Sequence, residues 1–129
     1  GLIQQLSNIF IKIGKNNIFI IYTVITFGSV FLSSFIDNIP YVATMLPVVS
    51  QIATTANAPI YLLYFGLLSG ATLGGNLTPI GASANITTIA ILKKEGYNVK
   101  LKDYFKIGIP FTLAAVITGY LYIWFVWGK

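Results

Sequence analysis

The sequence contains neither cysteine nor histidine, and only three of its 129 residues are acidic. These absences exclude disulfides, metal sites built from Cys or His, and the Cys or His catalysis of many enzymes. Asp37 is the only acid outside the polar stretch around residue 100, so general acid–base catalysis has no second group to use. We therefore expect a protein that is not an enzyme and that holds no resident metal or cofactor.

Formal charge of either sign is scarce. Charged residues make up 9% of the chain and hydrophobic residues 56%, whereas about a quarter of the residues in a soluble domain are charged. So few charges cannot cover a soluble surface, and the expected partner is the lipid bilayer. No linker or shift in composition divides the chain, so residues 1–129 are expected to form one domain.

The net charge of +5 comes from eight basic residues, all of them lysines, against three acids. The lysines lie in short polar stretches between apolar runs. This arrangement is typical of membrane loops rather than of a surface that binds phosphates. We expect no nucleic-acid partner.

The apolar runs predict an all-α polytopic membrane protein. Residues 1–16 place apolar side chains at helical spacing with polar ones opposite, which predicts an amphipathic helix at the membrane interface. Residues 18–56 form two apolar arms joined by Asp37, Asn38 and Pro40, which predicts a helical hairpin. Pro40 suits the first turn of the second arm, where its missing N–H costs nothing. The hairpin either crosses the bilayer twice or is re-entrant, with its tip inside the protein.

Residues 60–92 carry no formal charge, and a continuous helix of that length would extend about 50 Å, too far for one crossing. Glycines and a proline interrupt the middle of this run. We predict a broken transmembrane helix, with half-helices at 60–73 and 83–92 around an unwound stretch at 74–82. The residues that break the helix are Gly74, Gly75, Pro79 and Gly81, and those that offer ligand oxygens are Asn76, Thr78, Ser83 and Asn85.

These small and polar residues have a second interpretation as helix-packing residues, because Gly66, Gly70 and Gly74 have the G-x-x-x-G spacing common in membrane helices. A helix break is harder to explain by packing. Polar backbone at membrane depth is tolerated only inside the protein or beside a cavity. Broken apolar segments are also the best sequence indication of a transporter's binding site.

The C-terminal part of the sequence predicts a cytoplasmic loop at 93–106 and a last transmembrane helix at 107–127, anchored by Trp124 and Trp127. The excess of lysines in the loop sets this orientation and places the C-terminus outside. The loop lysines are Lys93, Lys94, Lys100, Lys102 and Lys106, against Lys12, Lys15 and Lys129 on the other side.

Asp37 is an ionisable residue that lies between two long apolar segments. A charged side chain at membrane depth is costly and by default functional, so this carboxylate is expected to carry a proton or to hold Na⁺. The alternative is that the hairpin tip reaches the far interface, where Asp37 would be a turn or helix-capping residue.

The two breaks together resemble the ion transporter superfamily. Residues 33–47 (SSFIDNIPYVATMLP) resemble the second helical hairpin of its members, and residues 70–86 (GATLGGNLTPIGASANI) resemble the broken helix that follows. The resemblance is greatest to arsenite-efflux permeases and sodium–proton antiporters, which are related to citrate-transporter-like proteins and divalent-anion/sodium symporters. It covers nearly the whole chain.

The resemblance implies that the chain is the second, C-terminal of two inverted repeats, with a re-entrant hairpin whose tip meets the unwound stretch. Such a carrier moves an inorganic ion or small anion by alternating access, coupled to H⁺ or Na⁺. Sodium-coupled symporters have Ser-Asn-Thr where this chain has Asp37, Asn38 and Ile39, which favours arsenite-type transport or sodium/proton antiport. The alternatives are a sodium-coupled di- or tricarboxylate symporter and a non-transporting scaffold or split subunit.

The resemblance also implies the binding residues and the partners. The expected partners are the N-terminal repeat, in the same protein or in a separate subunit, and a second copy in a homodimer within the cell membrane. Because the chain starts at Gly1 and its only methionine is Met45, we expect a fragment or a processed product. The expected ion- and substrate-binding side chains are Asp37, Asn38, Asn76, Thr78, Ser83 and Asn85, with a Na⁺ site at Asn38, Gly74 and Asn76.

Overall fold

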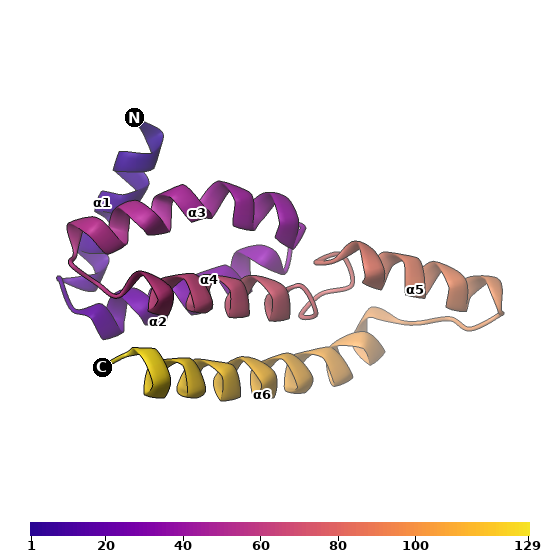
Figure 1. Cartoon of the computed structure of the whole chain (residues 1–129). Helices are drawn as coiled ribbons and strands as arrows, with labels where there is room; N and C mark the ends of the chain where they lie inside the picture. Colours follow the sequence, from indigo (N-terminus) through magenta and orange to yellow (C-terminus); the bar gives the residue numbers. More distant parts are fainter.

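The computed structural model describes residues 1–129 and contains six helices and no strand, as the predicted all-α class requires (Figure 1). Helix α4 lies in the middle of the bundle, against α2, with α3 on one side and α6 on the other, and α5 extends away from them. The helices are α1 (Leu2–Gly14), α2 (Ile18–Ser33), α3 (Asn38–Thr55), α4 (Ile60–Gly74), α5 (Ser83–Lys94) and α6 (Leu101–Trp127).

A tight turn joins α1 to α2. Lys15 and Asn16 have positive φ angles of 47° and 58°, so the chain reverses directly after Gly14. Asn17 then caps α2, because its side-chain oxygen accepts a hydrogen bond of 2.9 Å from the backbone N–H of Phe19. The turn folds α1 back so that it packs against both α2 and α3.

Helices α2 and α3 are the two arms of a hairpin whose turn is residues 34–37. Asn38 opens α3, so Pro40 falls in its first turn, where no intrahelical N–H bond is lost. Near the turn the hydroxyls of Ser29 and Tyr41 form a buried hydrogen bond of 3.0 Å that connects the two arms.

A seam of glycines brings α4 unusually close to α2. Gly66, Gly70 and Gly74 all face α2, and the position of a Cβ atom on Gly74 would lie 2.5 Å from the carbonyl oxygen of Val30. A Cβ atom on Gly70 would meet the carbonyl oxygen of Thr26. The packing interpretation of the G-x-x-x-G spacing therefore describes this seam, because small residues let two helix backbones approach.

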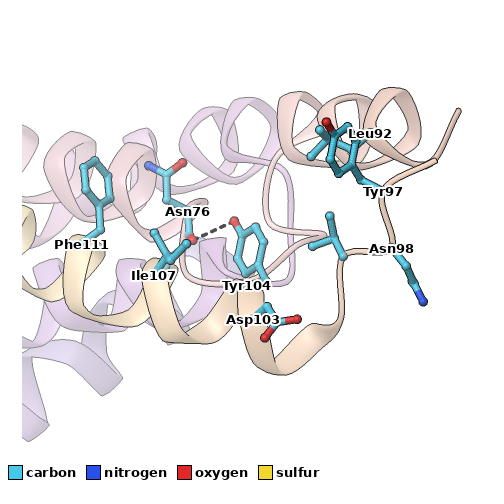
Figure 2. A pocket seen from close by; sticks show the side chains of 10 residues that line it. Asn76, Leu92, Tyr97, Asn98, Asp103, Tyr104, Ile107 and Phe111 are labelled. Carbon is cyan, nitrogen blue, oxygen red and sulfur yellow. Dashed lines mark hydrogen bonds between the residues drawn. The ribbon is translucent and has the colours of Figure 1, made fainter. Parts of the chain in front are cut away.

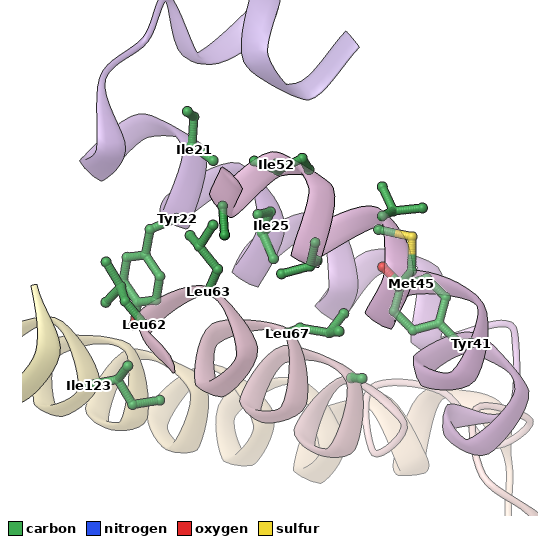
Figure 3. Packing of buried hydrophobic residues seen from close by; sticks show 14 residues of the cluster. Ile21, Tyr22, Ile25, Tyr41, Met45, Ile52, Leu62, Leu63, Leu67 and Ile123 are labelled. Carbon is green, nitrogen blue, oxygen red and sulfur yellow. The ribbon is translucent and has the colours of Figure 1, made fainter. Parts of the chain in front are cut away.

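The hydrophobic core fills the space between α2, α3 and α4 (Figure 3). Ile25 of α2, Ile52 of α3 and Leu63 and Leu67 of α4 are essentially inaccessible to solvent. Helix α6 covers a further side of α4 through one narrow stripe and leaves most of its apolar side chains exposed. The buried residues of this stripe are Gly108, Thr112, Val116 and Ile123.

One helix, α6, is long and apolar enough to cross a membrane. Helices α2 and α4, with 16 and 15 residues, extend only about 24 and 22 Å, less than the roughly 30 Å of a bilayer's hydrocarbon core. Of the two hairpin arms, α2 is thus too short for a full crossing, and α3, with 18 residues, extends about 27 Å. The re-entrant arrangement and the inverted repeat themselves stay predictions.

The stretch between α5 and α6 is shorter than the loop predicted at 93–106. Helix α5 continues to Lys94 and α6 begins at Leu101, so only residues 95–100 are non-helical. The charges of this stretch are compatible with helix ends: Lys93 and Lys94 lie in the last turn of α5, and Asp103 lies in the first turn of α6. Both placements complement the helix dipole, and apolar periodicity alone does not detect such turns.

Candidate functional site

The hairpin turn and the helix break lie against each other, although 44 residues separate their contact in sequence. The hydroxyl of Thr78, which is 7% exposed, donates a hydrogen bond to the carbonyl oxygen of Ser34 at the tip of the hairpin. Gly81 seals the same contact, because a Cβ atom there would lie 2.8 Å from the Ser34 oxygen and 2.6 Å from that of Gly75. Only glycine fits this position without moving backbone.

The amide side chain of Asn85 stabilises the conformation of the break. Helix α4 ends at Gly74 and α5 begins at Ser83, so residues 75–82 are irregular. Asn85, in the first turn of α5, donates hydrogen bonds from its Nδ2 atom to the carbonyl oxygens of Gly75 at 2.9 Å and Thr78 at 3.2 Å. It thereby satisfies two carbonyl groups that the break removes from helical bonding.

Helix α6 contributes a third contact to the break (Figure 2). The hydroxyl of Tyr104 donates a hydrogen bond of 3.0 Å to the carbonyl oxygen of Asn76. Gly108, one turn further along α6, lies under the same oxygen, which would be 3.1 Å from a Cβ atom at this position. The side chains of Asn76, Asp103 and Tyr104 line a cavity of about 580 Å³ together with residues of α5 and of the loop at 95–100.

Four carbonyl oxygens at the break, those of Gly74, Gly75, Asn76 and Thr78, therefore already have donors within the protein. Besides the bonds from Asn85 and Tyr104, the Gly74 oxygen accepts from the backbone N–H of Leu77 at 2.9 Å. A carbonyl oxygen has two lone pairs and can bind a cation with the second one. A cation at the predicted Na⁺ site would therefore either share the Gly74 and Asn76 oxygens with their present donors or displace the Leu77 N–H group and the Tyr104 hydroxyl.

Asp37 and Asn38 lie at the start of α3, beside the hairpin turn, and both are partly buried. Asp37 occupies the capping position of α3, yet its side chain makes no capping hydrogen bond. No side-chain hydrogen bond is formed by Asn38 either, and no Lys lies between residues 16 and 92. The carboxylate and the amide thus keep their oxygens free of partners within the chain.

The structure brings together some of the predicted residues and separates others. Thr78, Gly75, Gly81 and Asn85 converge on the hairpin tip or on the break, and Asn76 joins them through its backbone. Ser83 is exposed on the first turn of α5, with no bond to this group.

Three contributors were missed by the sequence analysis. Ser34 supplies the carbonyl oxygen at the hairpin tip, and Ser33 donates a buried hydrogen bond of 2.6 Å to the carbonyl oxygen of Ala71 in α4. The pair of serines at the end of an apolar arm is the sequence feature that could have indicated these two contacts. Tyr104 lay in the stretch predicted as a loop, and nothing in its surroundings in the sequence indicated a partner.

Comparison with known proteins identifies the family of the chain. A family model described as "Citrate transporter" (CitMHS) matches residues 1–129, the whole chain. The chain belongs to the citrate transporter family. This membership confirms the resemblance to the ion transporter superfamily.

Several relatives of this citrate transporter family member are similar over most of its length. A 46 kDa membrane protein of Mycobacterium leprae is 39% identical over 104 residues, covering 78% of this chain and 24% of the relative. The P protein of Homo sapiens is 38% identical over 97 residues, covering 74% of this chain and 12% of the relative. An uncharacterised transporter of Mycobacterium tuberculosis is 29% identical over 133 residues, covering 99% of this chain and 31% of the relative.

The chain thus spans less than a third of the length of these curated relatives. No solved structure matches it.

Proposed function

We propose that this chain is the C-terminal repeat of a secondary active transporter, and that the hairpin tip and the helix break together form one half of its ion and substrate site. The observation that supports this most is the buried contact between Thr78 and the Ser34 carbonyl, sealed by Gly81. Two interruptions of apolar helices, far apart in sequence, meet at one point. Irregular backbone beside a cavity is the usual construction of a transporter site.

The cargo we propose is an inorganic ion or a small anion, moved by alternating access and coupled to H⁺ or Na⁺. The free carboxylate of Asp37 and the free amide of Asn38 are suited to a proton or a hard cation. The Na⁺ site proposed at Asn38, Gly74 and Asn76 would use oxygens only. Because no lysine accompanies these residues, the positive charge needed by an anionic cargo would come from bound Na⁺ or from the other repeat.

The second candidate is a sodium-coupled di- or tricarboxylate symporter, which the description of the matching family favours. In that case the carboxylates of the cargo would repel Asp37, so this residue would have to be protonated or paired with a cation during binding. The two candidates therefore differ in what Asp37 does.

The test is transport by the full-length protein in proteoliposomes, with native Asp37 and with Asp37→Asn. Internal pH is recorded after Na⁺ jumps, and arsenite and citrate uptake are measured separately. We expect native protein to move protons or arsenite, and Asp37→Asn to abolish this flux while leaving the protein folded. The matched control is Glu95→Gln, which removes an exposed acid from the loop at 95–100 and is expected to leave transport unchanged.

Each of the other outcomes decides against one part of the proposal. Undiminished flux in Asp37→Asn would show that Asp37 is only a turn residue. Citrate uptake that depends on Na⁺, without arsenite or proton flux, would favour the symporter.

A further inference from the structure

A second cavity lies at the end of the molecule opposite the helix break. Its volume is about 570 Å³, and it opens where the α1–α2 turn, the start of α4 and the end of α6 meet. Gly108 and Trp124 lie near the two ends of α6 and are separated by about 24 Å along the helix, so this cavity is remote from the transport site. The lining residues are Lys15, Asn16, Asn17, Ile18, Phe19, Pro59, Trp124, Gly128 and Lys129.

The polar side of this cavity carries positive charge and no acid. Lys15 and Lys129 both line it, although more than a hundred residues separate them in sequence. The three acidic residues of the chain all lie elsewhere. Asn17 uses its side-chain oxygen to cap α2, which leaves its NH₂ group to act as a donor. The lining therefore provides the Asn17 NH₂ group and two lysines, which is the chemistry that recognises a phosphate. The Lys129 ammonium lies over the ring of Phe125, 4.8 Å from its centroid, and would turn from there toward a bound phosphate.

The other side of the cavity is aromatic and apolar. The rings of Phe19 and Trp124 meet edge to face with centroids 4.7 Å apart, and Ile18 lies beside them in the lining. Trp124 and Trp127 end the one helix long enough to cross a membrane. Tryptophans at such a position lie at the level of the lipid headgroups, so the lysines lie where phosphates of the bilayer are found.

We propose that this cavity binds the phosphate group of an anionic lipid, with Lys15 and Lys129 on the phosphate and with Phe19 and Trp124 against the glycerol and the first part of the acyl chains. The ligand chemistry is a phosphate ester with uncompensated negative charge. A lipid in the bilayer is the source that the interfacial position favours, and a soluble phosphate ester is the other source.

The test uses the full-length protein in a neutral detergent. Dissociation constants are measured for dioleoyl phosphatidylglycerol and for dioleoyl phosphatidylcholine, which has the same acyl chains but a headgroup without net charge. We expect the phosphatidylglycerol to bind more tightly. The double variant Lys15→Gln/Lys129→Gln should weaken its binding at least about tenfold, because each lysine near anionic lipid contributes roughly fivefold.

The matched control is Lys93→Gln/Lys94→Gln, which removes the same charge from exposed positions at the other end of the molecule. We expect less than a twofold effect from it. Equal weakening by both double variants, or equal affinity of native protein for the two lipids, would overturn the proposal. Glycerol 3-phosphate added as a competitor separates the sources: an inhibition constant well above the dissociation constant of phosphatidylglycerol identifies the lipid, and an equal or lower one identifies a soluble phosphate ester as the ligand of the same site.

Discussion

The two helices that flank the break are built in opposite ways. Helix α4 buries seven of its 15 residues, whereas α5 buries none of its 12. Helix α4 is fixed by the glycine seam on α2 and by the hydrophobic core, whereas Ile86 and Ile91 of α5 are 52% and 55% exposed. In Figure 1 α5 extends from the bundle as a separate arm. The break therefore joins a rigid half of the site to a half that the rest of the chain scarcely supports.

This difference indicates where a further segment would be needed. An apolar helix with no cover must lie against lipid or against another segment, because exposed isoleucines in water are unfavourable. The chain spans less than a third of the relatives' length, so a further segment is available in them. The comparison between α4 and α5 can be tested by substitutions, each paired with a matched control variant.

Among the substitutions on α4, at the break and on α5, the largest effect is expected at the glycine seam. Gly70→Ala would place a Cβ atom on the backbone oxygen of Thr26, whereas Gly28→Ala meets no atom within 4 Å. The first variant should lower the free energy of unfolding by about 2 kcal/mol through overpacking. The second should raise it by up to about 1 kcal/mol through the better helix propensity of alanine.

Unfolding of both variants in detergent, followed by circular dichroism, measures this contrast. Changes of the same sign in the two variants would show that the seam is not closely packed in the folded protein.

An intermediate effect is expected at the contact between hairpin and break. Thr78→Val removes the hydroxyl that donates to Ser34 and leaves a buried carbonyl without this donor. We expect a loss of about 1 to 2 kcal/mol in the free energy of unfolding, together with slower transport. Thr87→Val is the same change at an exposed hydroxyl that bonds only within α5, and it should have little effect on either measurement. Equal losses in the two variants would argue against a structural contact at the hairpin tip.

The smallest effect is expected on α5. Ile91→Ala should change the free energy of unfolding in detergent by less than about 0.5 kcal/mol, since a lipid or detergent tail covers either side chain equally well. Ile52→Ala makes the same change inside the core, where Ile52 is fully buried, and should cost about 2 to 5 kcal/mol. A loss above about 2 kcal/mol at Ile91 would instead show that another protein segment packs on α5.

The positions of the helix interruptions could be predicted because they depend on local chemistry. Pro40 and the glycines at 74 and 75 act on their own backbone, and the observed helix ends at Ser33, Gly74 and Ser83 lie close to those expected. The start of α6 was not predicted, because the charges of Lys102, Asp103 and Lys106 conceal a helical turn from a search for apolar periodicity.

The partners within the candidate site could not be predicted from local chemistry. The bonds from Thr78 to Ser34 and from Tyr104 to Asn76 connect residues 44 and 28 positions apart. Such pairings depend on how the helices pack, and a single sequence carries no direct record of this. The role of Asn85 was expected to be that of an oxygen ligand, whereas the structure uses its NH₂ group as a donor.

The hydrogen bonds of Asn85 attach α5 to the break at one end only, so the helix can tilt about its first turn. Two hydrogen bonds hold the first turn of α5 to the carbonyls of Gly75 and Thr78, and the remaining helix is free of the bundle. A rigid helix of 12 residues is about 18 Å long, so a tilt of about 10° at this turn would carry its far end, at Lys94, through about 3 Å. A small rearrangement at the break would thereby be magnified at the far end of α5, and a displacement of the exposed loop at 95–100 would be transmitted back to the break.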